Sequence, residues 1–334
     1  MTDKIKLADG SGKGLSAFLN QHILPALDMD GSAALEDAAV LAPEDGSLVF
    51  TTDSFTVTPL EFNGGDIGKL AACGTINDLA MMGAVPRFIS LGLIIEEGLE
   101  TDVLVRMLTS FTTVCRQSNV RLVCGDTKVV ERGKADRLFI NTSGIGFVRD
   151  GLNISAANAK PSDAVIVSGP IGRHGIAVLA ARKNLGFASD TVSDCAPLNN
   201  EVCSLLSAVP RTRTLRDATR GGCAAVLNEI ADSSSVTITL KSHSIPVSEC
   251  VASACSFLGF EPIQIANEGT FVAVVPPDQT ESALKSLSGH PQTAQAAVIG
   301  TVGEQQDFNV LLETPLGGLR PVDNPPGRLL PRIC

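Results

Sequence analysis

Tryptophan and tyrosine are absent from this 334-residue sequence, and its 13 phenylalanines supply all of its Phe, Trp and Tyr rings. Membrane-interface belts and base-stacking surfaces both depend on such rings, so their scarcity argues against both. Basic residues are also few, because 26 Lys and Arg stand against 36 Asp and Glu and give a net charge of −10. A surface that neutralises nucleic-acid phosphates needs the opposite balance. We therefore expect neither a membrane nor a nucleic acid among the partners.

Long hydrophobic runs are lacking as well. The longest, residues 88–95, is far shorter than the roughly 20 residues of a membrane span, and the N-terminus has no apolar stretch of signal-peptide length. These absences predict a cytoplasmic protein, in which thiols stay reduced. The nine cysteines form no CxxC pair and the four histidines are scattered, so nothing indicates a zinc or iron–sulfur site. We interpret most cysteines as small core residues; Cys223, for example, shares a helical stripe with Val226, Leu227 and Ile230.

Helix and strand signals are mixed along the whole chain. Apolar residues make up 44% of the sequence and charged residues 19%, which is enough for a packed core. Stretches with helical periodicity, such as 104–115, 202–209 and 251–258, alternate with apolar runs that are typical of strands. This mixture predicts an α/β (α+β) fold. The strand-like runs are residues 48–52, 121–124, 138–142, 164–168, 236–240, 271–275 and 297–302.

A polar, alanine-rich stretch near residues 150–162 suggests a domain boundary. We place an N-terminal domain at residues 1–155 and a second domain at residues 156–320. The remaining residues, 321–334, include four prolines, which remove backbone donors and resist helix formation. They are predicted to form an extended tail.

Four aspartates of the first half lie near predicted element ends or turns: Asp37, Asp53, Asp78 and Asp126. Hard cations such as Mg²⁺ bind carboxylate oxygens and often bridge to substrate phosphates. Aspartates that converge on one rim would suit that work. Aspartate is also common in turns and at helix N-caps, which explains any one of them alone equally well.

Two further features are candidates for phosphate binding. Lys128 follows Asp126 closely and could offset phosphate charge, although a solvated surface lysine is the simpler interpretation. The segment 216–222 (Arg-Asp-Ala-Thr-Arg-Gly-Gly) leads directly into a predicted helix, whose N-terminal N–H groups and dipole suit phosphate. The glycine-rich stretch 10–14 lacks P-loop spacing, and a flexible loop explains it as well. His174 is a weaker candidate, more simply interpreted as a buried or capping residue.

Glu268 lies between the apolar runs 263–266 and 271–275, which are predicted to form a hairpin. A glutamate at that place could act as a general base, and an exposed turn residue is the simpler alternative.

Cys334 is the last residue of the printed sequence, at the end of the proline-rich segment. Packing does not explain a cysteine there, whereas a mobile thiol can serve as a nucleophile or carrier. The terminal carboxylate should raise the pKa of the thiol, and Arg332 should partly counter that effect. A frayed end with no role is the alternative.

The motifs, taken together and in order, resemble the HypE family of hydrogenase maturation factors. The similarity extends from about residue 8 to the last residue, although position 13 is Lys where the family usually has Gly. The residues that carry it are Thr52–Phe55, Pro59–Leu60, Gly64–Leu70, Asn77–Leu79, Gly125–Val130, Arg216–Gly222, Ala266–Gly269 and the ending Pro331–Cys334.

The resemblance implies a fold like that of aminoimidazole ribonucleotide synthetase (PurM type). In that fold an N-terminal α/β domain pairs with its copy in a homodimer, and ATP binds in the cleft beside a C-terminal α+β domain. The implied activity is that of an ATP-dependent carbamoyl dehydratase. A HypF-type carbamoyltransferase loads the terminal cysteine, the carbamoyl group is dehydrated to a thiocyanate, and the cyano group passes to iron on a HypC–HypD complex.

The resemblance also implies roles for individual residues. Cys334 would carry the reacting group, with Glu268 as the base and Lys128 as a second catalytic residue. Mg²⁺ would be held by Asp37, Asp53, Asp78 and Asp126. The expected ATP-binding residues are Asp37, Lys69, Asn77, Asp126, Thr127, Lys128, His174, Arg216, Asp217, Thr219, Arg220, Gly221 and Gly222.

Two other functions fit parts of the sequence. Another enzyme of the same fold, such as selenophosphate synthetase or thiamine-monophosphate kinase, would use the acidic residues. Neither enzyme would explain the terminal Pro-Arg-Ile-Cys. A selenophosphate synthetase would also have a cysteine or selenocysteine within residues 8–16, which contain no cysteine here. A non-catalytic carrier would use Cys334 alone, and ATP hydrolysis separates it from the enzyme.

Overall fold

The computed structural model describes residues 3–29, 38–42, 44–148, 151–182 and 189–324. Asp37 and Cys334 therefore lie outside the described residues. The first part of the chain contains α1 (Gly12–Phe18), α2 (Leu24–Ala26), β1 (Ser47–Phe55), β2 (Glu61–Phe62), β3 (Gly65–Asp66), α3 (Ile67–Met81), β4 (Ala84–Glu96), α4 (Thr101–Gln117), β5 (Arg121–Val130) and β6 (Leu138–Val148).

The second part begins after residue 150. It contains β7 (Ala164–Val167), α5 (Arg173–Ala180), α6 (Asn199–Ala208), β8 (Thr214–Asp217), α7 (Gly222–Ser234), β9 (Val236–Lys241), α8 (Glu249–Leu258), β10 (Phe271–Val275), α9 (Thr280–Ser288), β11 (Ala297–Glu304), β12 (Val310–Glu313) and β13 (Leu319–Pro321).

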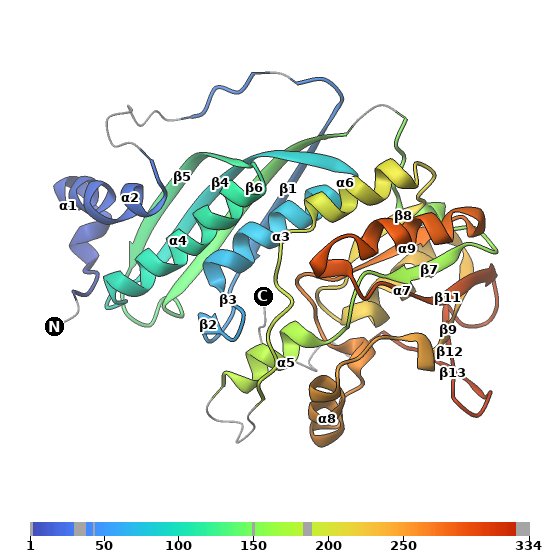
Figure 1. Cartoon of the computed structure of the whole chain (residues 1–334). Helices are drawn as coiled ribbons and strands as arrows, with labels where there is room; N and C mark the ends of the chain where they lie inside the picture. Colours follow the sequence, from blue (N-terminus) through green and yellow to red (C-terminus); the bar gives the residue numbers. More distant parts are fainter. Residues whose placement is uncertain (1–2, 30–37, 43, 149–150, 183–188, 325–334) are drawn as a thin grey trace.

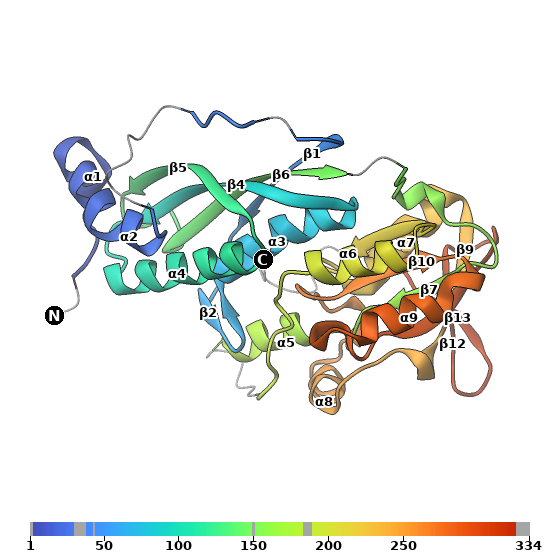
Figure 2. The same ribbon diagram turned by 45° about the horizontal axis from the view of Figure 1, so that its top comes forward.

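Four strands of the first part form a sheet in the order β1-β6-β4-β5, in which β4 and β5 run parallel and the other neighbours are antiparallel. Helices α3 and α4 lie together on one face of this sheet (Figures 1 and 2). Because strand side chains alternate between faces, Phe55, Leu93 and Ile95 are buried against the helices, while Phe50 and Ile94 lie exposed on the opposite face.

The second part is built on a seven-stranded sheet in the order β13-β12-β9-β11-β7-β10-β8. Its central strands are apolar on both faces, which is typical of a sheet between two helical layers. Val165 and Val272 pack in one core with residues of α7, while Ile166 and Phe271 pack in another with residues of α6 and α9. Figure 1 shows α6 beside α3, where the two parts meet.

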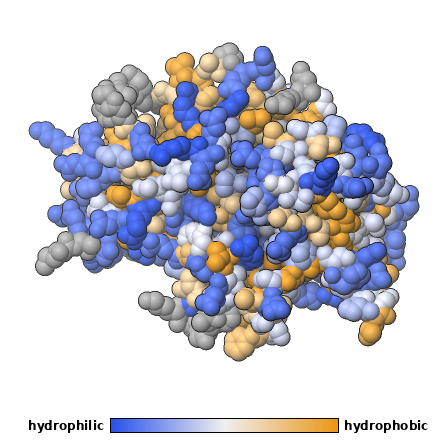
Figure 3. Space-filling model, viewed as in Figure 1, coloured by the Kyte–Doolittle hydropathy of each residue, from blue (hydrophilic) through white to orange (hydrophobic). Residues whose placement is uncertain are grey.

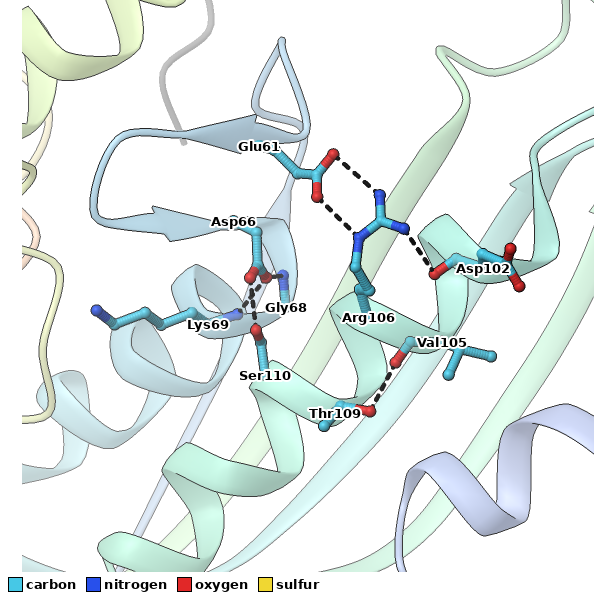
Figure 4. Close-up of polar contacts among 9 residues, drawn as sticks. All are labelled: Glu61, Asp66, Gly68, Lys69, Asp102, Val105, Arg106, Thr109 and Ser110. Carbon is cyan, nitrogen blue, oxygen red and sulfur yellow. Dashed lines mark hydrogen bonds and ion pairs between the residues drawn. The ribbon is translucent and has the colours of Figure 1, made fainter. Parts of the chain in front are cut away.

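The short hairpin of β2 and β3 is held against α3 and α4 by charged side chains (Figure 4). Asp66 is the N-cap of α3, and its carboxylate accepts from the backbone N–H groups of Gly68 and Lys69 at 2.8 and 2.9 Å and from the Ser110 hydroxyl at 2.5 Å. Arg106 of α4 pairs with Glu61 of β2. The start of α3, which leads to the site described below, is thereby fixed on two sides.

The strand-like runs expected from the sequence lie in strands of the structure, apart from residue 168, which follows β7, and the expected helices at 104–115, 202–209, 223–231 and 251–258 correspond to α4, α6, α7 and α8. Two expectations were wrong. Residues 263–266 form no strand, because a 3₁₀ turn occupies Pro262–Gln264. The glycine-rich stretch 10–14 is not a flexible loop, because α1 begins at Gly12. Most of the described cysteines are buried, as expected, and the exceptions are Cys124, Cys203 and Cys250, which are exposed.

Buried cysteines make up the rest of the described set. Burial raises the pKa of Cys223 and of Cys115 to about 12, so both stay thiols and act as packing residues. At the other end of the second part, Pro321 pairs with Leu311 and Val322 is buried, so the sheet includes the first residues of the segment expected to form a tail. No helix in the described part of the chain is long and apolar enough to cross a membrane.

Candidate functional site

A cavity of about 250 Å³ opens where the two parts of the chain meet. Its lining comes from β1, α3, the end of β8, the loop that follows β8, and the turn before β10. The lining residues are Thr52, Asp53, Phe55, Gly74, Asp78, Asp217, Thr219, Arg220 and Glu268. Four of the lining residues carry carboxylic acids, so the cavity is strongly acidic.

Asp53 and Asp78 form the N-terminal side of the cavity. Asp53 lies on the helix-covered face of β1 and Asp78 on the facing helix α3, where the Thr51 hydroxyl donates to its carboxylate at 2.8 Å. Burial raises the pKa of Asp78, and the neighbouring Asp53 adds to the rise. Two neighbouring carboxyl groups of this kind are suited to binding a cation, which would relieve their repulsion.

Asp217 and Glu268 form the opposite side. Burial, followed by the charge of Asp78, raises the pKa of Asp217 to about 7, so this carboxyl titrates near neutral pH. Glu268 is only 3% exposed, and one of its oxygens, Oε1, is buried without a hydrogen-bond partner. Burial raises the pKa of Glu268 well above its ordinary value, with the charges of neighbouring acidic groups adding to it. The expectation of an exposed hairpin turn at this residue was therefore wrong.

The segment 216–222 contributes Asp217, Thr219 and Arg220 to the lining. Arg216 instead forms an ion pair with Glu229 of α7, and its charge opposes only in part the rise in the pKa of Asp78 that burial causes. The backbone N–H of Gly222 donates to the Thr219 carbonyl at 2.9 Å, so it is already engaged within the turn. Gly221, with φ +78°, is the N-cap of α7.

The strand residues Asp126, Thr127 and Lys128 lie elsewhere in this chain. On β5, Asp126 and Lys128 point to the open face of the sheet, whereas Thr127 is buried on the helix side with Leu93. The Lys128 ammonium donates to Asp126 at 2.7 Å and lowers the pKa of that carboxyl. Since Asp53 occupies the other face, the structure does not bring Asp126 together with Asp53 and Asp78 in one chain.

Three other expected ATP-binding residues have partners within the protein. The Lys69 ammonium donates to the Gly64 carbonyl at 2.8 Å. The amide of Asn77 donates to the carbonyls of Ala196 and Glu268 and accepts from Leu198 N–H, which ties α3 to the second part of the chain. His174 is fully buried and lies 2.9 Å from the Ser193 hydroxyl.

Some residues of the site were not expected. Phe55 and Gly74 line the cavity, and the alternation of β1 could have indicated Phe55, because residues 53 and 55 of a strand share a face. Asp194 contacts the turn that carries Glu268, and no motif surrounds it. Within the described residues, no group of three or more His, Cys, Asp or Glu side chains is arranged to hold a metal ion.

Family models match most of the chain. The AIR synthase related protein N-terminal domain matches residues 35–148, and its C-terminal domain matches residues 160–313. The carbamoyl dehydratase HypE of Rhizobium leguminosarum bv. viciae is 45% identical over 99% of this chain and 95% of its own length. The carbamoyl dehydratase HypE of Azotobacter vinelandii is 43% identical over 99% of this chain and 97% of its own length.

This chain belongs to the HypE family. A crystal structure of hydrogenase maturation protein HypE in complex with ATP superposes on it with a TM-score of 0.93, at 42% identity and covering 99% of this chain and 100% of that one. A crystal structure of a HypE–HypF complex contains a chain that matches with a TM-score of 0.81 and 44% identity, covering 94% of this chain and 100% of that one.

Among more distant structures, the thiamine-monophosphate kinase of Stenotrophomonas maltophilia K279a matches with a TM-score of 0.67 at 20% identity, covering 97% of this chain and all of that one. That similarity shows a common fold only. The PurM-like fold expected from the HypE resemblance is confirmed by the family models and by the HypE structures.

Proposed function

We propose that this chain is an ATP-dependent carbamoyl dehydratase of hydrogenase maturation, which converts an S-carbamoyl group on Cys334 to a thiocyanate. The observation that carries the proposal is the buried carboxyl of Glu268, whose Oε1 has no hydrogen-bond partner, in an acidic cavity of a chain that matches HypE proteins over 99% of its length. A thiol carrier would have no use for such a group.

The chemistry needs three operations. An amide oxygen is a poor leaving group, and transfer of the γ-phosphoryl group of ATP to it converts the loss of water into the loss of phosphate. The carbon–oxygen bond then breaks, the carbon–nitrogen bond becomes triple, and both N–H protons leave. The products are the thiocyanate, ADP and phosphate.

Glu268 suits the removal of a proton from nitrogen. A carboxylate with a raised pKa is a stronger base than an ordinary one, and its exclusion from water keeps it from being solvated. Arg220 and Thr219 line the same cavity and would face the developing phosphate charge. The role of Lys128 would require a second subunit, because in this chain Lys128 lies on the open face of the first sheet.

Magnesium fits the acidic side of the cavity. Asp53 and Asp78 would hold it, since their oxygens are hard ligands and their mutual repulsion raises the pKa of Asp78. When bound, the ion would neutralise charge on the triphosphate. Asp37 and Asp126 remain further candidate ligands from the sequence.

We also propose a homodimer, built on the open face of the first sheet. Leu48 and Phe50 of β1 are each 61% exposed there, and Ile94 of β4 lies on the same face. Figure 3 shows hydrophobic residues gathered at the top of the view, over this sheet. Asp126 and Lys128 share the face, so in such a dimer they would face the partner subunit.

The proposed partners follow from the reaction. A HypF-type carbamoyltransferase would load Cys334, in line with the HypE–HypF complex to which this chain is similar. A HypC–HypD complex would accept the cyano group. Both exchanges would be made through Cys334, the last residue of the printed sequence.

The test separates loading from dehydration. Because loading also uses ATP, the chain is incubated with the HypF-type enzyme, carbamoyl phosphate, ATP and Mg²⁺, and samples are taken over time. Intact mass spectrometry should show a carbamoyl adduct that appears first and then loses the mass of one water. Cys334→Ala should take up no carbamoyl group, whereas Cys203→Ala, which removes an exposed cysteine of α6, should behave as the wild type. An adduct that never loses water would favour the carrier.

A further inference from the structure

The turn that carries Glu268 is held by one buried carboxylate from a distant segment. Asp194 is 3% exposed. Its side chain accepts hydrogen bonds from Glu268 N–H at 3.2 Å, from Gly269 N–H at 3.0 Å and from the Thr270 hydroxyl at 2.9 Å. Three consecutive residues thus donate to a single side chain.

The backbone of Asp194 contacts the same turn from another side. The Gln292 side-chain amide donates to the carbonyls of both Asp194 and Gly269, at 2.9 and 3.0 Å. A Cβ atom at Gly269 would lie 1.8 Å from the Asp194 carbonyl oxygen, so only glycine permits this approach. The turn and the segment around Asp194 therefore form one closely packed unit.

This unit is also attached to the first part of the chain. Asn77 of α3 donates to the Glu268 carbonyl at 3.4 Å and to the Ala196 carbonyl at 3.1 Å. The backbone N–H of Ser193 donates to the Asn63 carbonyl at 2.9 Å. The position of the Glu268 backbone relative to Asp53 and Asp78 is thus set through residues 193–196.

We propose that Asp194 is a positioning residue for the dehydration, which holds the Glu268 carboxyl against the acidic side of the cavity. The inference rests on the proposed function, because it assigns Asp194 a part in the same reaction. Asp194 acts only through Glu268, whose own carboxyl has no hydrogen-bond partner on Oε1 to fix it. Removing the acceptors of Asp194 would free the turn, and small displacements of a reacting group reduce rates strongly.

The variant Asp194→Asn keeps one acceptor oxygen and replaces the other with an NH₂ group, which donates and cannot accept from the turn. Thr270→Val is a milder variant, which removes one donor and keeps the side-chain shape. Asp190→Asn is the matched control, since Asp190 belongs to the same segment and is exposed. Each variant is treated in the same way, and the carbamoylated and dehydrated forms are followed by intact mass over time at several ATP concentrations.

For Asp194→Asn, we expect the dehydration rate to fall by about 10- to 100-fold, the KM for ATP to stay within about twofold of the wild type, and carbamoyl loading to be unchanged. The dehydration rate of Thr270→Val should fall by about fivefold, and that of Asp190→Asn should match the wild type. Loading does not use Glu268, so a merely structural defect would lower loading and dehydration together.

The inference is overturned if Asp194→Asn and Thr270→Val dehydrate at the wild-type rate, or if they lose loading and dehydration in equal measure. Circular dichroism checks that each variant is folded. If Asp194→Asn does not fold, the result for Thr270→Val alone decides whether the inference holds. Failure of the proposed function gives a different result, because the carbamoylated wild type would then not lose water in ATP.

Discussion

Glu268 is a residue that the fold buries without providing a partner for Oε1. Replacing it by glutamine keeps the size and removes the base. For Glu268→Gln we expect carbamoyl loading at the wild-type rate and a fall of dehydration by about 10²- to 10⁴-fold, the usual contribution of general base catalysis. Single-turnover mass spectrometry measures both steps. Glu304→Gln, an exposed exchange on β11, is the control, and an unimpaired Glu268→Gln variant would remove Glu268 from the mechanism.

Asp66, at the start of α3, provides a test of how the free energy of unfolding depends on pH. Burial raises its pKa, and the hydrogen bonds from Ser110 and from the start of α3 only partly oppose the rise. The folded state therefore binds the proton more tightly than the unfolded state, and this stabilisation is present below the unfolded value of about 3.9. It is lost as the pH rises from there through the folded pKa.

Asp66→Asn removes this titration and keeps an oxygen that can cap α3. The free energy of unfolding of the wild type, minus that of Asp66→Asn, should increase as the pH falls from 6 to 4. Urea unfolding at several pH values, followed by circular dichroism, measures the difference. A difference that decreases on acidification would show that hydrogen bonding outweighs burial at this residue.

Single residues differ in how far the sequence could reveal them. Asp53 and Asp78 were found from their places beside predicted elements and Asp217 from the family resemblance, and the structure gathers them around one cavity. The burial of Glu268 could not be found in this way, because it depends on Asp194, which lies 74 positions away and has no motif around it. Local pattern carries no information about such a contact.

At the scale of elements, apolar runs predicted where strands lie but not which strands are neighbours. Asp126 follows a correctly predicted run, yet the register of β5 on β4 places it on the face opposite to Asp53. A shift of one residue along a strand moves a side chain to the other face, so the strand bounds alone could not predict that the two aspartates separate.

The glycines at the start of α7 have a structural role in addition to the phosphate binding that the sequence suggests for the segment 216–222. Gly222 has φ +60°, and a Cβ atom there would lie 2.5 Å from the Ile265 carbonyl oxygen and 2.7 Å from that of Ile263. Backbone atoms cannot yield as a side chain can. For Gly222→Ala we expect the free energy of unfolding to fall by about 3 kcal/mol or more.

Gly259 is the matched control for that variant. It has φ +72° at the end of α8, and a Cβ atom there would meet nothing within 4 Å. Gly259→Ala should therefore lose only about 1 kcal/mol, the cost of the backbone conformation. Urea unfolding of both variants makes the comparison, and equal losses would show that conformation rather than close approach makes Gly222 necessary.

At the scale of the whole molecule, the two parts of the chain supply different sides of one cavity, so any change in how they sit would alter the distance between Glu268 and Asp78. Asn77 bridges them with both ends of its amide. Its assignment as an ATP ligand came from its place in a motif. The structure suggests another reason for that motif, because a helix that contributes Asp78 to the site needs a neighbour that fixes it to the opposite wall.

The open face of the first sheet gives the last prediction. Leu48 is 61% exposed on β1, and apolar side chains on one sheet face indicate a surface that another chain covers. Leu48→Asp would place a charge in the proposed dimer interface, where burial without a partner is costly. We expect the wild type to be a dimer and Leu48→Asp to be a monomer at micromolar concentration. Sedimentation velocity over a range of concentrations measures both.

Leu319→Asp is the control for that variant, since Leu319 is 59% exposed on β13 of the second sheet. It should stay dimeric, because only the first sheet forms the proposed interface. If Asp126 and Lys128 act across the interface, the monomeric Leu48→Asp variant should also dehydrate its carbamoyl group more slowly, while Leu319→Asp keeps the wild-type rate. A wild-type monomer, or a Leu48→Asp dimer as stable as the wild type, would contradict the interface and leave Lys128 without a route to the reacting group.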